Sequence, residues 1–204
     1  MNESTWGSRT PTVRFFPGFP LPVTDYGELL GLLEANAEPG QPIVIAHSRG
    51  ALDALASDIP PKVPIFLLAP SVPRRRRGTR LLKGSLFLVA AIPVVRVVLS
   101  RRLRKETYRR YSAEAPPGQP LDLGAVARRL RADTSAGIGR GSRTVVLVLS
   151  EEDARYEDQL LLARRLDATV LHQPGGHLFP ITQAASTAST VLAILASGIH
   201  PPHS

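Results

Sequence analysis

Short apolar runs alternate with segments of helical periodicity along most of this 204-residue chain. Runs of strand length rich in Val, Ile, Leu and Phe are typical of buried strands, and they predict strands at 12–16, 42–46, 63–69, 144–149 and 168–172. Apolar residues at helical spacing predict helices at 25–36, 49–58, 156–166 and 182–197. Because the two kinds of element alternate, the pattern predicts an α/β fold with a mostly parallel sheet of about five or six strands and helices on both faces.

The start of the first predicted helix carries two acidic residues. Asp25 and Glu28 have the spacing of a capping box, in which side chains satisfy free N–H groups of the first turn. We therefore expect Asp25 to cap this helix.

A serine lies at one predicted strand-to-helix junction. The sequence IVIAHSRGAL, residues 43–52, passes from an apolar run through Ser48 into a helical stripe. A turn this tight leaves room only for small side chains two positions before and after the serine, and Ala46 and Gly50 occupy those positions. The junction therefore predicts that Ser48 is a nucleophile.

This junction resembles the nucleophile elbow of the α/β hydrolase family, G-H-S-x-G, with Ala46 in place of the first glycine. The resemblance implies that an acid and then a histidine follow the serine, each after a later strand. The segments L-S-E-E-D and P-G-G-H-L follow the last two predicted strands at the family's usual separation. The resemblance therefore implies Ser48 as the nucleophile, Asp153 as the orienting acid and His177 as the general base.

Other acidic and imidazole side chains lie near these motifs. Glu151 and Glu152 adjoin Asp153, but the family's aspartate aligns with the third acidic residue. His47 flanks the serine and is expected to pack beside the site or support it. The remaining histidines are expected outside the site, on a strand or in a Pro-rich tail: His172, His200 and His203.

Acyl transfer also requires donors for an oxyanion, normally backbone N–H groups. The resemblance implies one donor at Arg49, the residue after the nucleophile, and a second in the loop after the first strand. There Pro17 replaces the histidine of the family's H-G loop and Gly18 is retained, so the N–H of Phe19 is the implied second donor. The alternative interpretation of this stretch is a simple proline-rich turn.

Basic residues gather between two of the predicted core strands. Residues 74–111 hold thirteen Arg and Lys residues against Glu106 alone, a net charge of +12, whereas the whole chain carries +8. The remainder of the chain therefore carries −4. We assign residues 1–70 and 141–204 to the hydrolase core and residues 71–140 to an inserted cap or lid, where this family usually places one.

The predicted cap also contains an apolar run, residues 84–100. This run is shorter than the roughly 20 residues of a membrane-spanning helix and is interrupted by Pro93 and Arg96, so we do not expect it to span a membrane. Three interpretations stay open: helices that line an acyl pocket, a surface segment on anionic lipid, or a subunit interface. Because arginine clusters bind phosphates and carboxylates, the cap predicts an acidic carrier protein or an anionic membrane surface as a partner, besides the acyl substrate.

Composition argues against several other classes of function. The chain has no cysteine, H-E-x-x-H motif or phosphate-binding loop, so we expect no disulfide, metal or cofactor. Aromatic residues make up only 5% of the chain and no nucleic-acid-binding motif occurs, so we expect no nucleic-acid partner despite a pI near 10.7. The start of the chain has no apolar stretch, which predicts a cytoplasmic protein without a signal peptide, able to lie at a membrane surface. Abundant Ala and few Lys residues indicate a GC-rich bacterial genome.

The predicted core is smaller than the family's. The family's first two strands are missing, and no strand is predicted between the loop after 12–16 and the strand at 42–46, where the family has one. The resemblance implies a serine hydrolase that cleaves an ester or thioester of a hydrophobic acyl group through an acyl-enzyme. Two alternatives stay open: a non-hydrolytic lyase or cyclase of specialised metabolism on the same fold, and a catalytically silent binding module.

Overall fold

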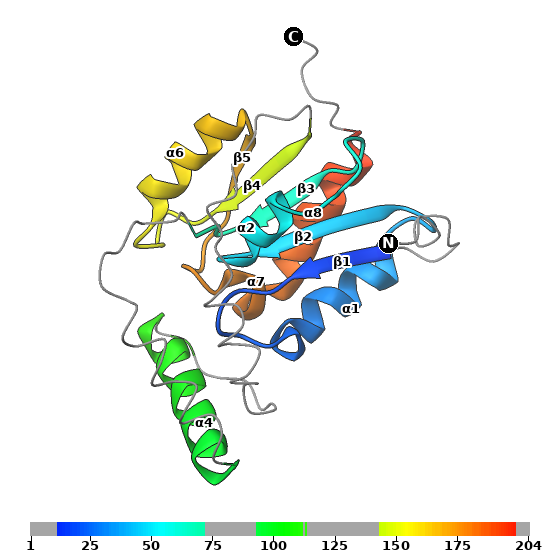
Figure 1. Cartoon of the computed structure of the whole chain (residues 1–204). Helices are drawn as coiled ribbons and strands as arrows, with labels where there is room; N and C mark the ends of the chain where they lie inside the picture. Colours follow the sequence, from blue (N-terminus) through cyan, green and yellow to red (C-terminus); the bar gives the residue numbers. More distant parts are fainter. Residues whose placement is uncertain (1–11, 72–92, 112, 114–142, 199–204) are drawn as a thin grey trace.

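Five parallel strands form an open sheet in the computed structural model, which describes residues 12–71, 93–111, 113 and 143–198 (Figure 1). The strands lie side by side in chain order: β1 (Thr12–Phe16), β2 (Pro42–His47), β3 (Ile65–Leu68), β4 (Val145–Leu149) and β5 (Thr169–His172). Each strand is parallel to its neighbours. The predicted α/β class and the five predicted strands are therefore confirmed.

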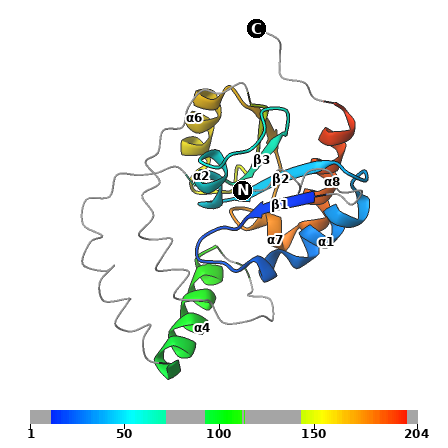
Figure 2. The same cartoon turned by 45° about the vertical axis from the view of Figure 1, so that its right-hand side comes forward.

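Helices cover both faces of the sheet. One face carries α1 (Gly27–Asn36) and α8 (Ala184–Ala196), and the other carries α2 (Gly50–Leu55) and α6 (Tyr156–Leu166). Two short elements precede the helices of the first face: the 3₁₀ turn η2 (Val23–Tyr26) and α7 (Phe179–Thr182). A further helix, α4 (Pro93–Arg110), extends away from the sheet, as Figures 1 and 2 both show.

Alternate residues of the central strands face the two helix layers. In β2, Ile43 and Ile45 pack with α1 and α8, whereas Val44 and Ala46 pack with α2 and α6. All four side chains are fully buried. A strand that is covered on both faces has no polar side, which explains why these strands appear in the sequence as continuous apolar runs.

The connection from β1 to β2 differs in hand from its neighbours. The steps from β1 to β2 and from β2 to β3 run in the same direction across the sheet, but their helices α1 and α2 lie on opposite faces. Two such connections must have opposite hands. The helix of the β4–α6–β5 unit lies on the same face as α2, so this unit has the same hand as β2–α2–β3. Because nearly all such units are right-handed, β1–α1–β2 is the left-handed exception. Among the described residues, no strand lies between β1 and β2, as the sequence predicts.

The loops that carry the predicted site residues all leave the same edge of the sheet. Because the strands are parallel, the carboxyl ends of β1, β2, β4 and β5 meet there. The loop after β1 holds Phe19, the turn after β2 holds Ser48, and the loops after β4 and β5 hold Asp153 and His177. The sheet thus brings together residues that are distant in the sequence.

A buried ion pair fastens α4 to the rest of the protein. Arg104 donates from Nη2 to Asp25 Oδ1 at 2.6 Å and from Nε to Oδ2 at 3.1 Å, and the Tyr108 hydroxyl donates to Oδ2 at 2.9 Å. Burial, followed by the Asp25 charge, raises the pKa of Tyr108. The predicted capping box is therefore wrong: no side chain caps η2 or α1, because the Asp25 carboxylate binds α4 instead.

Most of the predicted cap, residues 71–140, lies outside the described residues, as does the first half of the apolar run at 84–100. The division into core and cap therefore stays a prediction. None of the helices in the described part of the chain is long and apolar enough to cross a membrane.

Replacing Asp25 by Asn removes the charge that balances the buried Arg104 guanidinium. An uncompensated buried charge costs about 3–5 kcal/mol, so we expect Asp25→Asn to lower the free energy of unfolding by about that amount. Denaturant titration at neutral pH measures the change. Glu106→Gln is the matched control, because the Glu106–Arg109 pair on the same helix is exposed and contributes little. Equal effects of the two substitutions would show that the Asp25 pair does not hold α4.

Candidate active site

Ser48 occupies a strained turn between β2 and α2. Its φ of 51° lies in the left-handed region, which is costly for a residue with a side chain. The Ser48 N–H donates to the Leu68 carbonyl at 3.0 Å, which ties the turn to β3. Gly50 lies so close to the end of β1 that an added Cβ would collide with the Phe16 carbonyl oxygen. The small residue expected at this position is therefore required by packing.

The structure brings together the side chains of Ser48, His177 and Asp153. His177 Nε2 lies 2.9 Å from Ser48 Oγ, and His177 Nδ1 lies 2.6 Å from Asp153 Oδ2. All three residues are buried. Because an ionised carboxylate only accepts hydrogen bonds, Nδ1 carries the proton and Nε2 accepts the hydrogen bond of the Ser48 hydroxyl. An imidazole in this position can remove the serine proton.

Hydrogen bonds keep the Asp153 carboxylate ionised. Burial acts to raise its pKa, but bonds from His177, from the Arg155 N–H at 3.0 Å and from Gln159 Nε2 at 2.7 Å outweigh burial and hold the pKa below its usual value. The carboxylate is therefore charged at neutral pH. In this state it can stabilise a protonated His177.

The neighbouring acidic residues bind elsewhere. Glu152 accepts the Gly175 N–H at 3.3 Å, and Glu151 lies 3.7 Å from His172 at the end of β5. Neither is bonded to His177 in the structure. His200 and His203 lie outside the described residues. Across the described ranges, no group of three or more His, Asp or Glu side chains is placed to hold a metal ion.

The second buried histidine, His47, connects two loops of the site. Its Nε2 donates to the His177 carbonyl at 2.9 Å, and its Nδ1 accepts from the Tyr26 hydroxyl at 2.6 Å. Tyr26 in turn accepts the Gly18 N–H at 3.1 Å. These bonds join the loop after β1 to the loop after β5. Burial, followed by repulsion from His177, lowers the pKa of His47 to about 3, so its ring is neutral.

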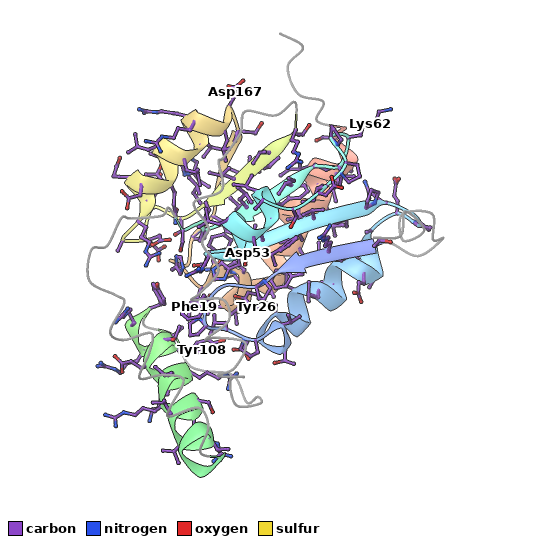
Figure 3. All side chains as sticks on the ribbon, viewed as in Figure 1. Phe19, Tyr26, Asp53, Lys62, Tyr108 and Asp167 are labelled. Carbon is purple, nitrogen blue, oxygen red and sulfur yellow. The ribbon has the colours of Figure 1, made fainter. Side chains whose placement is uncertain are left out.

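The two expected oxyanion donors lie on neighbouring segments. Phe19 is in the loop after β1, Arg49 follows Ser48, and the Arg49 guanidinium lies 5.7 Å from the centroid of the Phe19 ring. The N–H of Gly18 donates to the Tyr26 hydroxyl, whereas the N–H of Phe19 has no hydrogen-bond partner in the part of the chain that the structure describes. Phe19 and Tyr26 lie on the side of the molecule that carries α4 (Figure 3). The backbone N–H of Phe19 is therefore available to a ligand.

Three further residues near the site are not predicted from the sequence. Ser71 Oγ lies 2.8 Å from Ser48 Oγ, and Arg155 Nη1 donates to Ser71 Oγ at 2.7 Å. The ring of Tyr111, just after α4, stacks on His177 with centroids 4.5 Å apart. Ser71 and Arg155 follow β3 and β4, so their positions soon after predicted strands could have placed them at the carboxyl edge of the sheet. The sequence around Tyr111 holds no such signal.

The neutral state of His47 makes stability depend on pH. An unfolded histidine takes up a proton near pH 6.5, whereas folded His47 resists protonation until about pH 3, so the unfolded chain binds more protons between these values. Stability therefore falls as the pH drops through this window, by about 1.4 kcal/mol per pH unit from this group alone. His47→Gln retains a donor near Nε2 but does not titrate.

We expect the His47→Gln variant to show a shallower loss of unfolding free energy than the wild type between about pH 6 and pH 4, measured by denaturant titration. Parallel stability curves for the two proteins would contradict a buried, neutral His47.

Comparisons with known proteins point to one family. A family model described as the alpha/beta hydrolase family matches residues 6–190. A search of curated proteins gives no match. Among solved structures, a thioesterase domain from the curacin biosynthetic pathway is 19% identical, with a TM-score of 0.59 over 92% of this chain and 93% of that one. A carboxylesterase from the thaumarchaeon Nitrososphaera gargenis is 12% identical, with a TM-score of 0.54 over 93% and 90% of the two chains.

An epoxide hydrolase from Vigna radiata is 14% identical, with a TM-score of 0.53 over 94% of this chain and 92% of that one. At such identities the similarity to these structures shows the fold alone. The family model, however, spans most of the sequence. The chain belongs to the alpha/beta hydrolase family and is a hydrolase.

Proposed function

We propose that the protein is a serine hydrolase that cleaves an ester or thioester of a hydrophobic acyl group through an acyl-enzyme. The observation that carries this proposal is the pair of hydrogen bonds from Ser48 through His177 to Asp153 at the carboxyl edge of the sheet. In this proposal Ser48 is the nucleophile, His177 the general base and Asp153 the orienting acid.

In the first half-reaction, Ser48 Oγ attacks the acyl carbonyl carbon while its proton passes to His177 Nε2. A bond forms between Oγ and this carbon, and the carbonyl oxygen takes up the negative charge. As the tetrahedral intermediate collapses, the bond between the acyl carbon and the leaving oxygen or sulfur breaks, and the imidazolium gives the proton to the departing alcohol or thiol. Asp153 stabilises the imidazolium without taking its proton.

In the second half-reaction, water attacks the acyl-enzyme. His177 takes a proton from the water as the new carbon–oxygen bond forms, and it gives this proton to Ser48 Oγ as the bond between Oγ and the acyl carbon breaks. The carboxylic acid leaves and Ser48 is regenerated. The chemistry needs no cofactor.

The backbone N–H groups of Phe19 and Arg49 hold the oxyanion in this mechanism. The free N–H of Phe19 supports this assignment, as does the position of Arg49 directly after the nucleophile. The bonds among Gly18, Tyr26 and His47 hold the loop that carries Phe19. Donors that are fixed before the reaction stabilise developing charge at no cost in reorganisation.

The apolar sequence of the predicted cap, the run at 84–100, supports a hydrophobic acyl group. The C-terminal part of α4 is fastened by Arg104, and the chain after it places Tyr111 on the face of His177. In the proposed architecture, residues 71–140 form a cap on a core of residues 1–70 and 141–204. The described surface of α4 exposes basic side chains that fit an acidic carrier protein or an anionic membrane surface in the cytoplasm: Arg101, Arg102, Lys105, Arg109 and Arg110.

A fluorophosphonate probe, which reacts with activated serines, tests the nucleophile. We expect the wild type to be labelled and to hydrolyse acyl thioesters, and Ser48→Ala to lose both activities while staying folded. Asp153→Asn should slow turnover by about 10⁴-fold, because the imidazole loses its orientation and its charge partner. Ser189→Ala, an exposed serine on α8, is the matched control and should behave as the wild type.

Normal labelling and turnover in Ser48→Ala would contradict the mechanism. Ser48-dependent labelling without hydrolysis of any ester or thioester would favour a lyase or cyclase on this fold. A folded wild-type protein that takes up no probe would favour a catalytically silent binding module.

A further inference from the structure

The side chain of Arg155 crosses from the loop after β4 to the nucleophile. Its Nη1 donates to Ser71 Oγ at 2.7 Å, and Ser71 Oγ lies 2.8 Å from Ser48 Oγ. The guanidinium therefore has a nitrogen within about 6 Å of the nucleophilic oxygen. The Ser71 N–H also donates to the Ser48 carbonyl at 2.9 Å, so Ser71 is fixed to the nucleophile turn by its backbone as well.

The directions of these hydrogen bonds follow from the chemistry of the groups. The Ser48 hydroxyl donates to His177, so the Ser71 hydroxyl donates to Ser48 and accepts from Arg155. A guanidinium has several N–H donors and no acceptor, and Arg155 uses one of its side-chain donors in the structure. No carboxylate of the described residues forms an ion pair with Arg155. Arg155 is an exposed residue in the structure.

The Arg155 guanidinium lies on the opposite side of Ser48 from the Phe19 N–H, the proposed oxyanion donor. The neighbours of β2 in the sheet are β1 and β3; Phe19 follows β1, and Ser71 follows β3. A carbonyl oxygen held by the Phe19 N–H therefore points away from Ser71 and Arg155. The guanidinium faces a different part of the substrate.

We infer that Arg155, held in place by Ser71, binds an anionic oxygen group of the substrate, a carboxylate or a phosphate, a few bonds from the scissile carbonyl. A planar guanidinium binds such groups with paired hydrogen bonds. The anion lies on the acyl group or on the leaving group, and a charged leaving group is compatible with a hydrophobic acyl chain. This inference rests on the proposed hydrolysis at Ser48.

Two matched pairs of thioesters test the inference. In the first pair, the succinyl and butyryl thioesters of N-acetylcysteamine differ by a carboxylate in place of the terminal methyl of the acyl group. In the second pair, the butyryl thioesters of 3-mercaptopropionate and 1-propanethiol differ in the same way on the leaving group. The chain has no cysteine, so a thiol reagent measures the released thiol without a protein background, once an enzyme-free blank is subtracted.

We expect the wild type to prefer the charged member of at least one pair, measured as the ratio of kcat/KM values. Arg155→Gln should reduce this ratio on the order of 10- to 100-fold, through a rise in KM for the charged member, since a charged hydrogen bond is lost. Arg155→Lys should restore part of the preference. Arg164→Gln, an exposed arginine on α6, is the matched control and should leave the ratio unchanged. Inhibition of fluorophosphonate labelling by succinate or by inorganic phosphate distinguishes a carboxylate ligand from a phosphate ligand.

A wild type that prefers the neutral member of both pairs would overturn the inference, as would an Arg155→Gln variant that slows both members equally. In either case, normal fluorophosphonate labelling of the wild type would still support Ser48 as the nucleophile. Loss of all labelling and all thioester hydrolysis in the wild type would instead overturn the proposed function and this inference together.

Discussion

The His177 imidazole contacts Ser48 and Asp153 at the same time, and the other features of the site depend on this double contact. Parallel strands make it possible, because β2, β4 and β5 end at the same edge of the sheet and release their loops toward one another. The ring is held from two further directions. His47 binds the His177 carbonyl, and Tyr111 stacks on the face of the ring. A ring fixed in this way needs little reordering before it can accept a proton.

Adjacent residues of η2 perform two separate tasks. Tyr26 links Gly18 to His47 and so holds the loop with the proposed oxyanion donor, while Asp25 binds Arg104 and fastens α4. The chain that leaves α4 then places Tyr111 on His177. One short turn therefore positions both the oxyanion loop and the segment that lies over the imidazole.

Features that depend on local sequence could be predicted, and features that depend on distant contacts could not. Buried strands are visible as apolar runs, and the serine turn requires small neighbours such as Gly50. The positions of Asp153 and His177 followed from the family's order of residues. By contrast, the spacing of Asp25 and Glu28 indicates a cap, yet Asp25 binds a helix 79 residues away. The bonds of Ser71 and Arg155, and the hand of the β1–α1–β2 unit, likewise depend on how distant segments pack.

Proton NMR of the folded protein at neutral pH tests the double contact most directly. The Nδ1 proton of His177, held by a short bond to a buried carboxylate, should give a strongly downfield signal that Asp153→Ala removes and Ser48→Ala keeps. The His47→Gln variant separates this signal from that of the other buried imidazole. If the folded wild type shows no such signal, or if the signal survives in Asp153→Ala, His177 does not bridge the two residues and the account is contradicted.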